Sequence, residues 1–300
     1  MTAKPKRQKV NYLNNADLLV EIHKSKMSFC ELTDQRYSWY DIIVFEESDI
    51  NHTNIEQGKL NRVKRINSEM LRTIQKEHNC TPKKATEILG EDKLITIDDI
   101  NDDEVVFRLM CNDWIPQCPK KEENKLRTNF KPFKQFIIKN NAPVEVARSH
   151  WVGSFIDGEF HPRRGRLTEE LGKMIIVLAN RTSNKSNFRG YTYLDEMVSD
   201  ATLQVATNAL NFDESRETIQ LNPFAYYTTI IHNAFRHILN TEKRNRNIRD
   251  DLLIENGYEP STTRMAEIEI QMVKDNEERR LNEQTPKTTF GDESMWGDED

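Results

Sequence analysis

One side of a helical segment places an aromatic ring, amides and cations where they could contact a nucleic-acid strand. At the 3.6-residue helical period, the segment 222–240 turns Tyr226, Thr229, Asn233 and Arg236 to one side. Rings stack on bases at about 1–3 kcal/mol per base, cations contact phosphates, and Asn and Arg hydrogen-bond base edges. The cations continue along the chain as Lys243, Arg244, Arg246 and Arg249. The alternative interpretation is a solvated helix face with a basic end that the helix dipole favours.

The other side of the same segment has the pattern of a core-facing helix. Asn222 can cap the helix, and Pro223 follows at the position where its missing N–H costs nothing. The apolar residues expected to face the core are Tyr227, Ile230, Ile231, Ala234, Phe235 and Ile238. The sequence therefore predicts an amphipathic helix whose polar side is free for contacts.

The remaining elements position that helix. Apolar periodicity predicts helices over 14–26, 171–178 and 194–212, and a charged helix after Pro260. The block between the first helix and Pro162 has an α+β pattern: it predicts a helix over 61–80, strands over 37–45, 93–97 and 104–109, and a hairpin over 150–160.

Composition limits the class of protein. The 300 residues are 36% hydrophobic and 31% charged, with a net charge of −6, and no run reaches the ~20 apolar residues of a bilayer span. The basic start, 1–9, leads into a polar stretch rather than a signal peptide. We expect a cytoplasmic protein without a membrane partner, whose four scattered cysteines stay reduced.

Metal binding and catalysis have weaker support in the sequence. Cys111, Cys118, His150 and His161 could suggest zinc, but structural zinc ligands usually come in pairs two to four residues apart. The acidic cluster 98–104 lacks the order of an EF-hand loop. Phosphate-binding loops, metalloprotease motifs and nucleophile elbows are missing from the sequence. We therefore expect no cofactor and no enzyme activity; the alternative is a metal-dependent nuclease built on these Cys and His residues.

Two segments give the chain a family resemblance. GYTYLDEMVSDATLQVATNALNFDES (190–215) and NPFAYYTTIIHNAF (222–235) resemble conserved region two of bacterial sigma factors. They are more similar to the late-transcription sigma factors of T-even-like bacteriophages, and YLNNADLLVEI (12–22) shares the likeness. The resemblance covers a little over half of the chain and leaves out 27–162, which looks like a large insertion.

The resemblance implies a helix that docks on RNA polymerase. By this match the helix 196–212 lies on the coiled coil of the largest polymerase subunit of the host. The implied contact residues are Glu196, Ser199, Asp200, Thr202 and Ala206. An acidic face suits a basic coiled coil, although an ordinary solvated face would have the same composition.

The resemblance also implies how promoter DNA would be opened. Tyr226 matches the aromatic residue that stacks on a flipped-out adenine of the minus-ten element, and Asn233 and Arg236 match positions that read its upstream edge. Primary sigma factors wedge two tryptophans at the fork, where this chain has Thr229 and Ile230. A region resembling the minus-thirty-five reader is also missing from the sequence, so the resemblance implies a minimal sigma factor that depends on other proteins.

The acidic C-terminal end offers a candidate for that help. In the phage family this end binds the sliding clamp through apolar anchors, here matched by Phe290, Met295 and Trp296. A late co-activator would be a further partner. The alternative is a frayed acidic terminus.

These observations predict a mainly α fold: a sigma region-two-like helical bundle with a smaller α+β inserted domain. The expected parts are an N-terminal helix (1–26), the insertion (27–165), the promoter- and polymerase-binding helices (166–253), a helical linker (254–289) and the acidic tail (290–300). The expected function is late-promoter recognition in the cytoplasm of an infected bacterium. The alternative function is a polymerase-binding regulator that does not read DNA.

Overall fold

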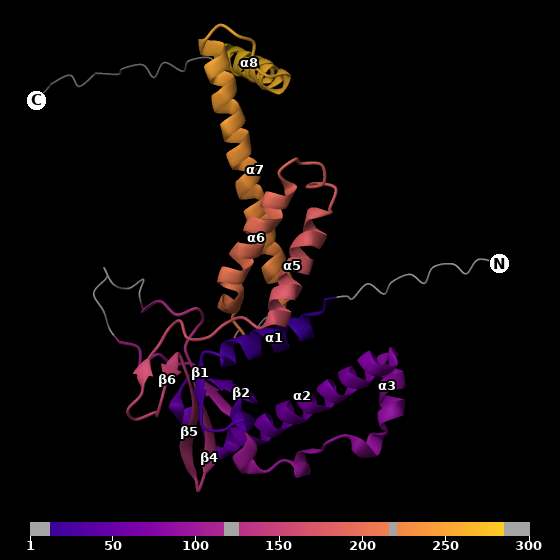
Figure 1. Ribbon diagram of the computed structural model, residues 1–300, viewed down its shortest axis with the longest axis vertical. Helices are drawn as coiled ribbons and strands as arrows, with labels where there is room; N and C mark the ends of the chain where they lie inside the picture. The colour runs from indigo at the N-terminus through magenta and orange to yellow at the C-terminus, as the bar shows by residue number, and fades with distance from the viewer. Residues whose placement is uncertain (1–12, 117–125, 216–220, 285–300) are drawn as a thin grey trace, which may run out of the picture. The chain divides into compact units, whose positions relative to one another are not determined.

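The chain is mainly α-helical with a smaller α+β part, which confirms the expected fold class at that level. The structure is a computed structural model that describes residues 13–116, 126–215 and 221–284. Figure 1 shows its elements, which form one compact unit up to Phe235 and a second from Arg236 onward. The boundary between the two units lies inside the long helix α7 (Pro223–Glu255).

A five-stranded sheet forms the centre of the α+β part. Its spatial order is β1 (Cys30–Leu32), β5 (Ala142–Ser149), β4 (Lys134–Lys139), β3 (Phe107–Leu109) and β2 (Ile42–Val44). Strands β2 and β3 pair in parallel, and the other neighbours are antiparallel. A separate hairpin joins β6 (Trp151–Val152) to β7 (Glu159–Phe160), which confirms the hairpin expected over 150–160.

The longest strand pair, β4 and β5, was not expected from the sequence. Its connection is the dipeptide Asn140–Asn141, and both residues have positive φ, 53° and 60°. Asparagine tolerates this left-handed conformation, and a two-residue turn of this kind matches the twist of a hairpin. The local signal was therefore present in the sequence.

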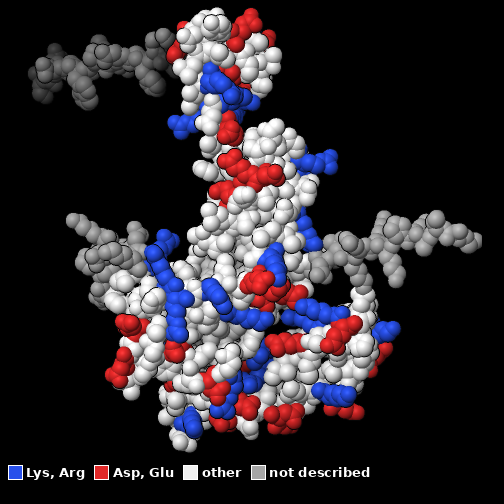
Figure 2. Space-filling view, viewed as in Figure 1, with Lys and Arg blue, Asp and Glu red and all other residues white. Residues whose placement is uncertain are grey.

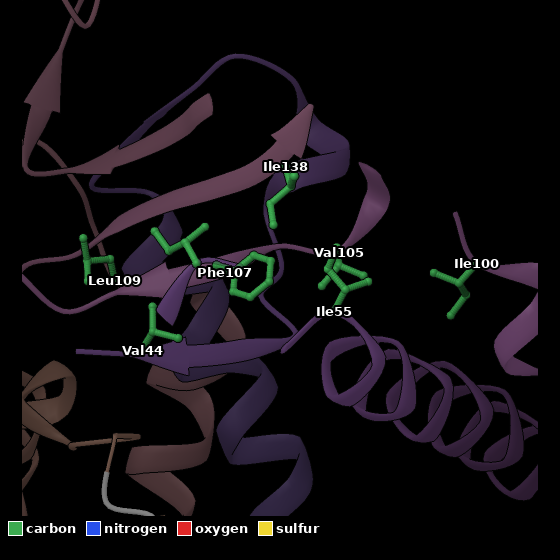
Figure 3. Close-up of a cluster of buried hydrophobic side chains, with 8 residues drawn as sticks. Val44, Ile55, Ile100, Val105, Phe107, Leu109 and Ile138 are labelled. Atoms are coloured by element: carbon green, nitrogen blue, oxygen red, sulfur yellow. The ribbon is translucent and has the colours of Figure 1, made fainter. Parts of the chain in front are cut away.

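Helix α2 (His52–His78) packs on the sheet through an apolar cluster, shown in Figure 3. The Asn51 side chain caps the helix by accepting a hydrogen bond from the Asn54 N–H. A Cβ atom at Gly58 would lie 2.4 Å from Val105 Cγ1, so the close approach of α2 requires glycine. The buried residues of this core are Val44, Ile50, Ile55, Ile100, Val105, Phe107, Leu109 and Ile138.

Helix α1 (Asn15–Met27) contacts α5 (Glu169–Ser183), and α5 in turn packs against α6 (Leu194–Asn208). The Asn14 side chain caps α1 and the Thr168 side chain caps α5. A 3-10 turn, Ala209–Asn211, follows α6. On α7, Tyr227, Ile231, Ala234 and Phe235 are buried as expected, whereas Ile230 and Ile238 are half-buried.

The chain leaves α1 and returns to α5 at neighbouring points. The Ser28 hydroxyl donates to the Arg166 carbonyl and accepts from the Arg166 N–H, each at 2.9 Å. The Thr168 N–H donates to Ser25 Oγ at 3.0 Å. Hydrogen bonds therefore tie the two ends of the intervening segment together.

The second unit contains the end of α7 and helix α8 (Thr262–Gln284). Asp250 on α7 accepts hydrogen bonds from the Ser261 N–H and hydroxyl, and Ser261 Oγ accepts from the Arg264 N–H at 3.3 Å. Among the described residues, no helix has the length and apolar character needed to cross a membrane.

Several expected boundaries in the α+β part are corrected. The strand expected over 93–97 is wrong: Glu91–Lys93 and Ile97–Asp99 are 3-10 turns, and Thr96 caps the second turn through a reciprocal pair with Asp99. Within 37–45 only β2 is extended, and a 3-10 turn, Gln35–Tyr37, precedes it.

The helical boundaries also differ in part. The helix expected over 61–80 begins at His52 because Asn51 caps it there. A separate short helix, α3 (Pro82–Leu89), follows α2. The remaining short turns are Glu47–Asp49 and Asp102–Glu104.

Candidate nucleic-acid interface

The start of α7 presents part of the expected polar strip to solvent. The Asn222 side chain accepts a hydrogen bond from the Ala225 N–H at 2.9 Å, which fixes the first turn. Thr229 and Asn233 are exposed one turn apart, and Ile230 beside them is half-buried. The Thr229 hydroxyl donates to the Ala225 carbonyl at 2.9 Å. The Asn233 amide has no such bond within the described residues, so it is the more available of the two for a ligand.

Tyr226 takes part in packing as well as lying on the strip. Its hydroxyl donates to the Asn208 carbonyl at 3.0 Å, and its ring centroid is 5.6 Å from that of Phe212. Burial raises the pKa of its phenol above the ordinary value. The half-buried ring is therefore held in place by its neighbours, and only its remaining exposed part is open to a base.

The cations of the strip belong to the second unit. Arg236, Arg244 and Arg249 are exposed, and none of them forms an ion pair with another described residue. Lys243 lies 3.1 Å from Glu267 of α8, and the half-buried Arg246 lies 3.8 Å from the same carboxylate. Glu267 was not expected from the sequence, and it partly neutralises the basic segment.

Helix α6 has the residues that the resemblance assigns to polymerase contact. Glu196 and Ser199 are exposed, whereas Asp200, Thr202 and Ala206 are half-buried. The opposite face of the helix, with Met197, Ala201 and Val205, is fully buried. The expected residues therefore lie on or beside the outward face.

An exposed leucine on α6 was missed by the sequence analysis. Leu203 is 66% exposed and lies seven residues after Glu196, on the same stripe of the helix. Met197, Ala201 and Val205 supply the buried face of the helix, so Leu203 lies on the outward side. Burial of its side chain by a partner would remove apolar surface from water, which favours binding.

A buried charged cluster includes Glu214, in the segment after α6, and the sequence analysis also missed it. Glu214 is 3.4 Å from Lys26 and 3.2 Å from Arg108, and all three side chains are almost completely buried. The Arg108 guanidinium is stacked between the rings of Tyr40 and Phe133, 3.8 and 3.9 Å from their centroids.

Charge neutralisation decides the protonation state of this cluster. Burial alone would raise the pKa of Glu214, but the charges of Lys26 and Arg108 outweigh it and lower that pKa. Burial lowers the pKa of His23, beside the cluster, to about 3, so the imidazole is neutral at ordinary pH. The cluster joins strand β3 to the segment after α6, residues far apart in the sequence.

The other candidate sites are not assembled by the described residues. No three His, Cys, Asp or Glu side chains within these residues converge as metal ligands. His150 is buried among aromatic rings, with its ring centroid 4.3 Å from that of Phe130. Cys118 and the expected clamp anchors Phe290, Met295 and Trp296 lie outside the described residues.

No family model, curated protein or solved structure matches the chain. Within the first unit, the first half of α7 presents exposed polar side chains, and α6 presents an acidic outward face with the exposed Leu203. The cations from Arg236 onward belong to the second unit.

Proposed function

We propose that the chain is a phage-encoded sigma factor that directs host RNA polymerase to late promoters in the cytoplasm of an infected bacterium. It recognises a minus-ten-like, AT-rich element and captures the melted non-template strand. The observation that carries this proposal is the division of α7. Thr229 and Asn233 face solvent where DNA can reach them, while Tyr227, Ile231 and Phe235 hold the helix rigidly from behind.

The cations supply the affinity for DNA that the polar strip alone would lack. Arg236, Arg244 and Arg249 are not engaged in ion pairs with described residues, so they are available to phosphates. Asn233 and Arg236 then contribute base readout and Tyr226 stacks on the extruded base. Phosphate contacts position a strand, and base contacts determine its sequence.

Helix α6 serves as the polymerase-docking element. Glu196, Ser199 and Asp200 give its outward side an acidic and polar character, and Leu203 adds an apolar anchor. Opposite charge steers docking on a basic coiled coil, and a desolvated leucine contributes to the bound state. The sigma-like bundle of this proposal consists of α1, α5, α6 and the start of α7.

Accessory proteins complete promoter opening in this proposal. Thr229 and Ile230 make a small wedge, so a sliding clamp that binds Phe290, Met295 and Trp296, together with a late co-activator, would supply the remaining energy. Extruding and unpairing bases costs about 1.4 kcal/mol per base-pair step. A tail truncated before Phe290 is therefore expected to lose clamp-dependent activation and to keep polymerase binding.

The decisive experiment is run-off transcription with host polymerase and a randomised minus-ten library. Asn233→Ala is expected to broaden the selected sequence more than it lowers total transcription, because it removes a base contact and no phosphate contact. Asn180→Ala, which changes an exposed amide on α5, is the matched control. An unchanged sequence preference in Asn233→Ala would contradict the base-reading role.

A second candidate, a polymerase-binding regulator that does not read DNA, is favoured by the packing of Tyr226. Its hydroxyl and ring are used within the protein, and Leu203 gives α6 a contact surface that does not need DNA. Leu203→Asp is expected to abolish polymerase binding under both functions. Tyr226→Ala combined with Arg236→Ala removes the stacking ring and one cation, so it is expected to abolish specific initiation only under the first function. Specific initiation that survives in this double variant would contradict the first function and favour the second.

A further inference from the structure

A cavity of about 380 Å³ lies between α1 and α2 in the first unit, and none of its lining residues belongs to α7. Figure 2 shows a hollow in the surface between these helices, bordered by basic and acidic side chains. Its volume is at the lower end of the range for small-ligand sites, about 300–1,000 Å³. The cavity is therefore large enough for one small ligand.

One wall of the cavity is apolar. Ala16, Leu19 and Val20 of α1 face it at helical spacing, and Trp39 borders it. The His23 ring stacks on Trp39 with centroids 4.0 Å apart, and the Arg65 guanidinium lies 5.2 Å from the Trp39 centroid. Trp39 is thus fixed in position before a ligand enters.

The opposite wall is a polar ridge of α2. Most of its hydrogen-bonding groups already have partners: Asn61 Nδ2 donates to the Asp41 carbonyl at 3.0 Å, and the Ser68 hydroxyl donates to the Arg65 carbonyl at 2.8 Å. Lys64 and Arg72 differ, because neither makes a hydrogen bond or ion pair with any residue that the structure describes.

The acids around the cavity are all neutralised by other cations. Asp41 lies 3.2 Å from both Arg62 and Arg65, and Glu69 lies 3.8 Å from Arg65. Glu214 is neutralised in the buried cluster described above. Two positive charges, on Lys64 and Arg72, are therefore left over, and they favour an anionic ligand.

We propose that this cavity binds one nucleotide, with the base against Leu19, Val20 and Trp39 and the phosphate between Lys64 and Arg72. A nucleotide joins a flat base, whose face can pack on apolar side chains, to an oxyanion, which matches an apolar wall opposite two unpaired cations. The nucleotide comes either from solution or from a single strand. The site goes beyond the proposed function, because it uses none of the α7 residues.

The test measures binding to the full-length protein by isothermal titration calorimetry. Deoxyadenosine monophosphate is compared with deoxyadenosine, which lacks the phosphate, and with inorganic phosphate, which lacks the base. The monophosphate is expected to bind more tightly than either fragment. Equal binding of inorganic phosphate would overturn the proposal, since the apolar wall would then contribute nothing.

The matched variants locate the binding. Lys64→Gln with Arg72→Gln is expected to weaken monophosphate binding by about tenfold or more, because two charge-assisted contacts are lost. Lys84→Gln removes an exposed α3 cation that has no ion pair among the described residues, and it should leave binding unchanged. An unchanged affinity in the double variant would also overturn the proposal.

An octadeoxyadenylate titration distinguishes the two sources of the nucleotide. Weaker binding of both ligands by the double variant identifies a strand, and weaker binding of the monophosphate alone identifies a free nucleotide. Val20→Phe narrows the cavity from the apolar wall with both cations intact, so it should weaken monophosphate binding too. If these variants bind the nucleotide normally, the nucleotide proposal is wrong, but the transcription test of Asn233 is unaffected. The two proposals can therefore be tested independently.

Discussion

The two halves of α7 are built on opposite principles. In the first unit Tyr227, Ile231 and Phe235 are completely buried, and the helix is held by apolar packing. From Arg236 onward no apolar side chain of the described residues is buried, and the buried residue there is Asp250, at 3% exposure. Leu252 is 53% exposed by contrast. One helix thus passes from a region stabilised by burial to one stabilised by polar contacts.

This difference indicates where contacts with other molecules can form with little loss of folding stability. Side chains that already maintain a core cannot be redirected to a ligand without a loss of stability. Polar and exposed side chains after Arg236 can change partners at little cost. The second half of α7 is therefore suited to adapt to a binding partner, whereas the first half is suited to present fixed side chains.

Phe235→Ala should break the first region most severely. The ring is fully buried and its centroid lies 4.9 Å from that of Phe188, so its removal leaves a cavity. We expect a loss of about 3–5 kcal/mol in the free energy of unfolding, measured by urea denaturation. Leu252→Ala is the matched change in the second region, with an expected effect below about 0.5 kcal/mol. Similar losses from the two variants would remove the contrast.

Glu214→Gln tests whether the first region also depends on its buried charges. The variant keeps the shape of the side chain and leaves Lys26 and Arg108 without their anion. We expect a loss of about 3 kcal/mol at pH 7, because an uncompensated buried charge is costly. A loss near zero in urea denaturation would show that solvent, rather than Glu214, neutralises the two cations.

His23 gives the first region a dependence on pH. Its pKa falls from 6.5 in the unfolded chain to about 3 in the folded protein, so the unfolded chain binds more protons between these values. Stability is therefore complete above pH 6.5 and declines on acidification. The His23 contribution should lose about 1.6 kcal/mol between pH 6.5 and pH 5. His23→Asn should flatten the pH profile by that amount, and parallel profiles would exclude His23 as the cause.

Ser261→Ala has the smallest expected effect, and it tests whether polar contacts stabilise the second region. The serine caps α8 and donates to Asp250 on α7, so its loss should cost about 1 kcal/mol of local stability. Hydrogen exchange of the α8 amides should accelerate, while exchange in α5 stays constant. Unaltered exchange in α8 would mean that apolar contacts, rather than this cap, hold the second region.

The parts of the fold that could be predicted depended on local signals. Asn222 and Pro223 predicted the start of α7, and helical periodicity identified the buried residues Tyr227, Ile231 and Phe235. The Asn140–Asn141 turn was equally local but was overlooked. The strand expected over 93–97 failed because the pair formed by Thr96 and Asp99 favours a tight turn over an extended ladder.

The candidate sites were predictable only in part for the same reason. Exposure of Asn233 follows from its place on the helix, whereas the engagement of Tyr226 with Asn208 depends on how α7 meets the end of α6. The meeting of Arg108 with Glu214 joins residues 106 positions apart, which periodicity cannot show. The sequence likewise cannot show that Lys64 and Arg72 have no ion-pair partner among the described residues, because this depends on the position of every neighbouring side chain.

The paired hydrogen bonds between Ser28 and Arg166 join the two ends of the long segment that separates α1 from α5. Because the segment starts and ends at the same place, its length does not affect the spacing of the two helices on either side of it. Surface loops of this segment could change in length while α1 and α5 keep their mutual alignment, provided that Arg108 still pairs with Glu214. Such changes would alter the surface of the protein without moving the two helices.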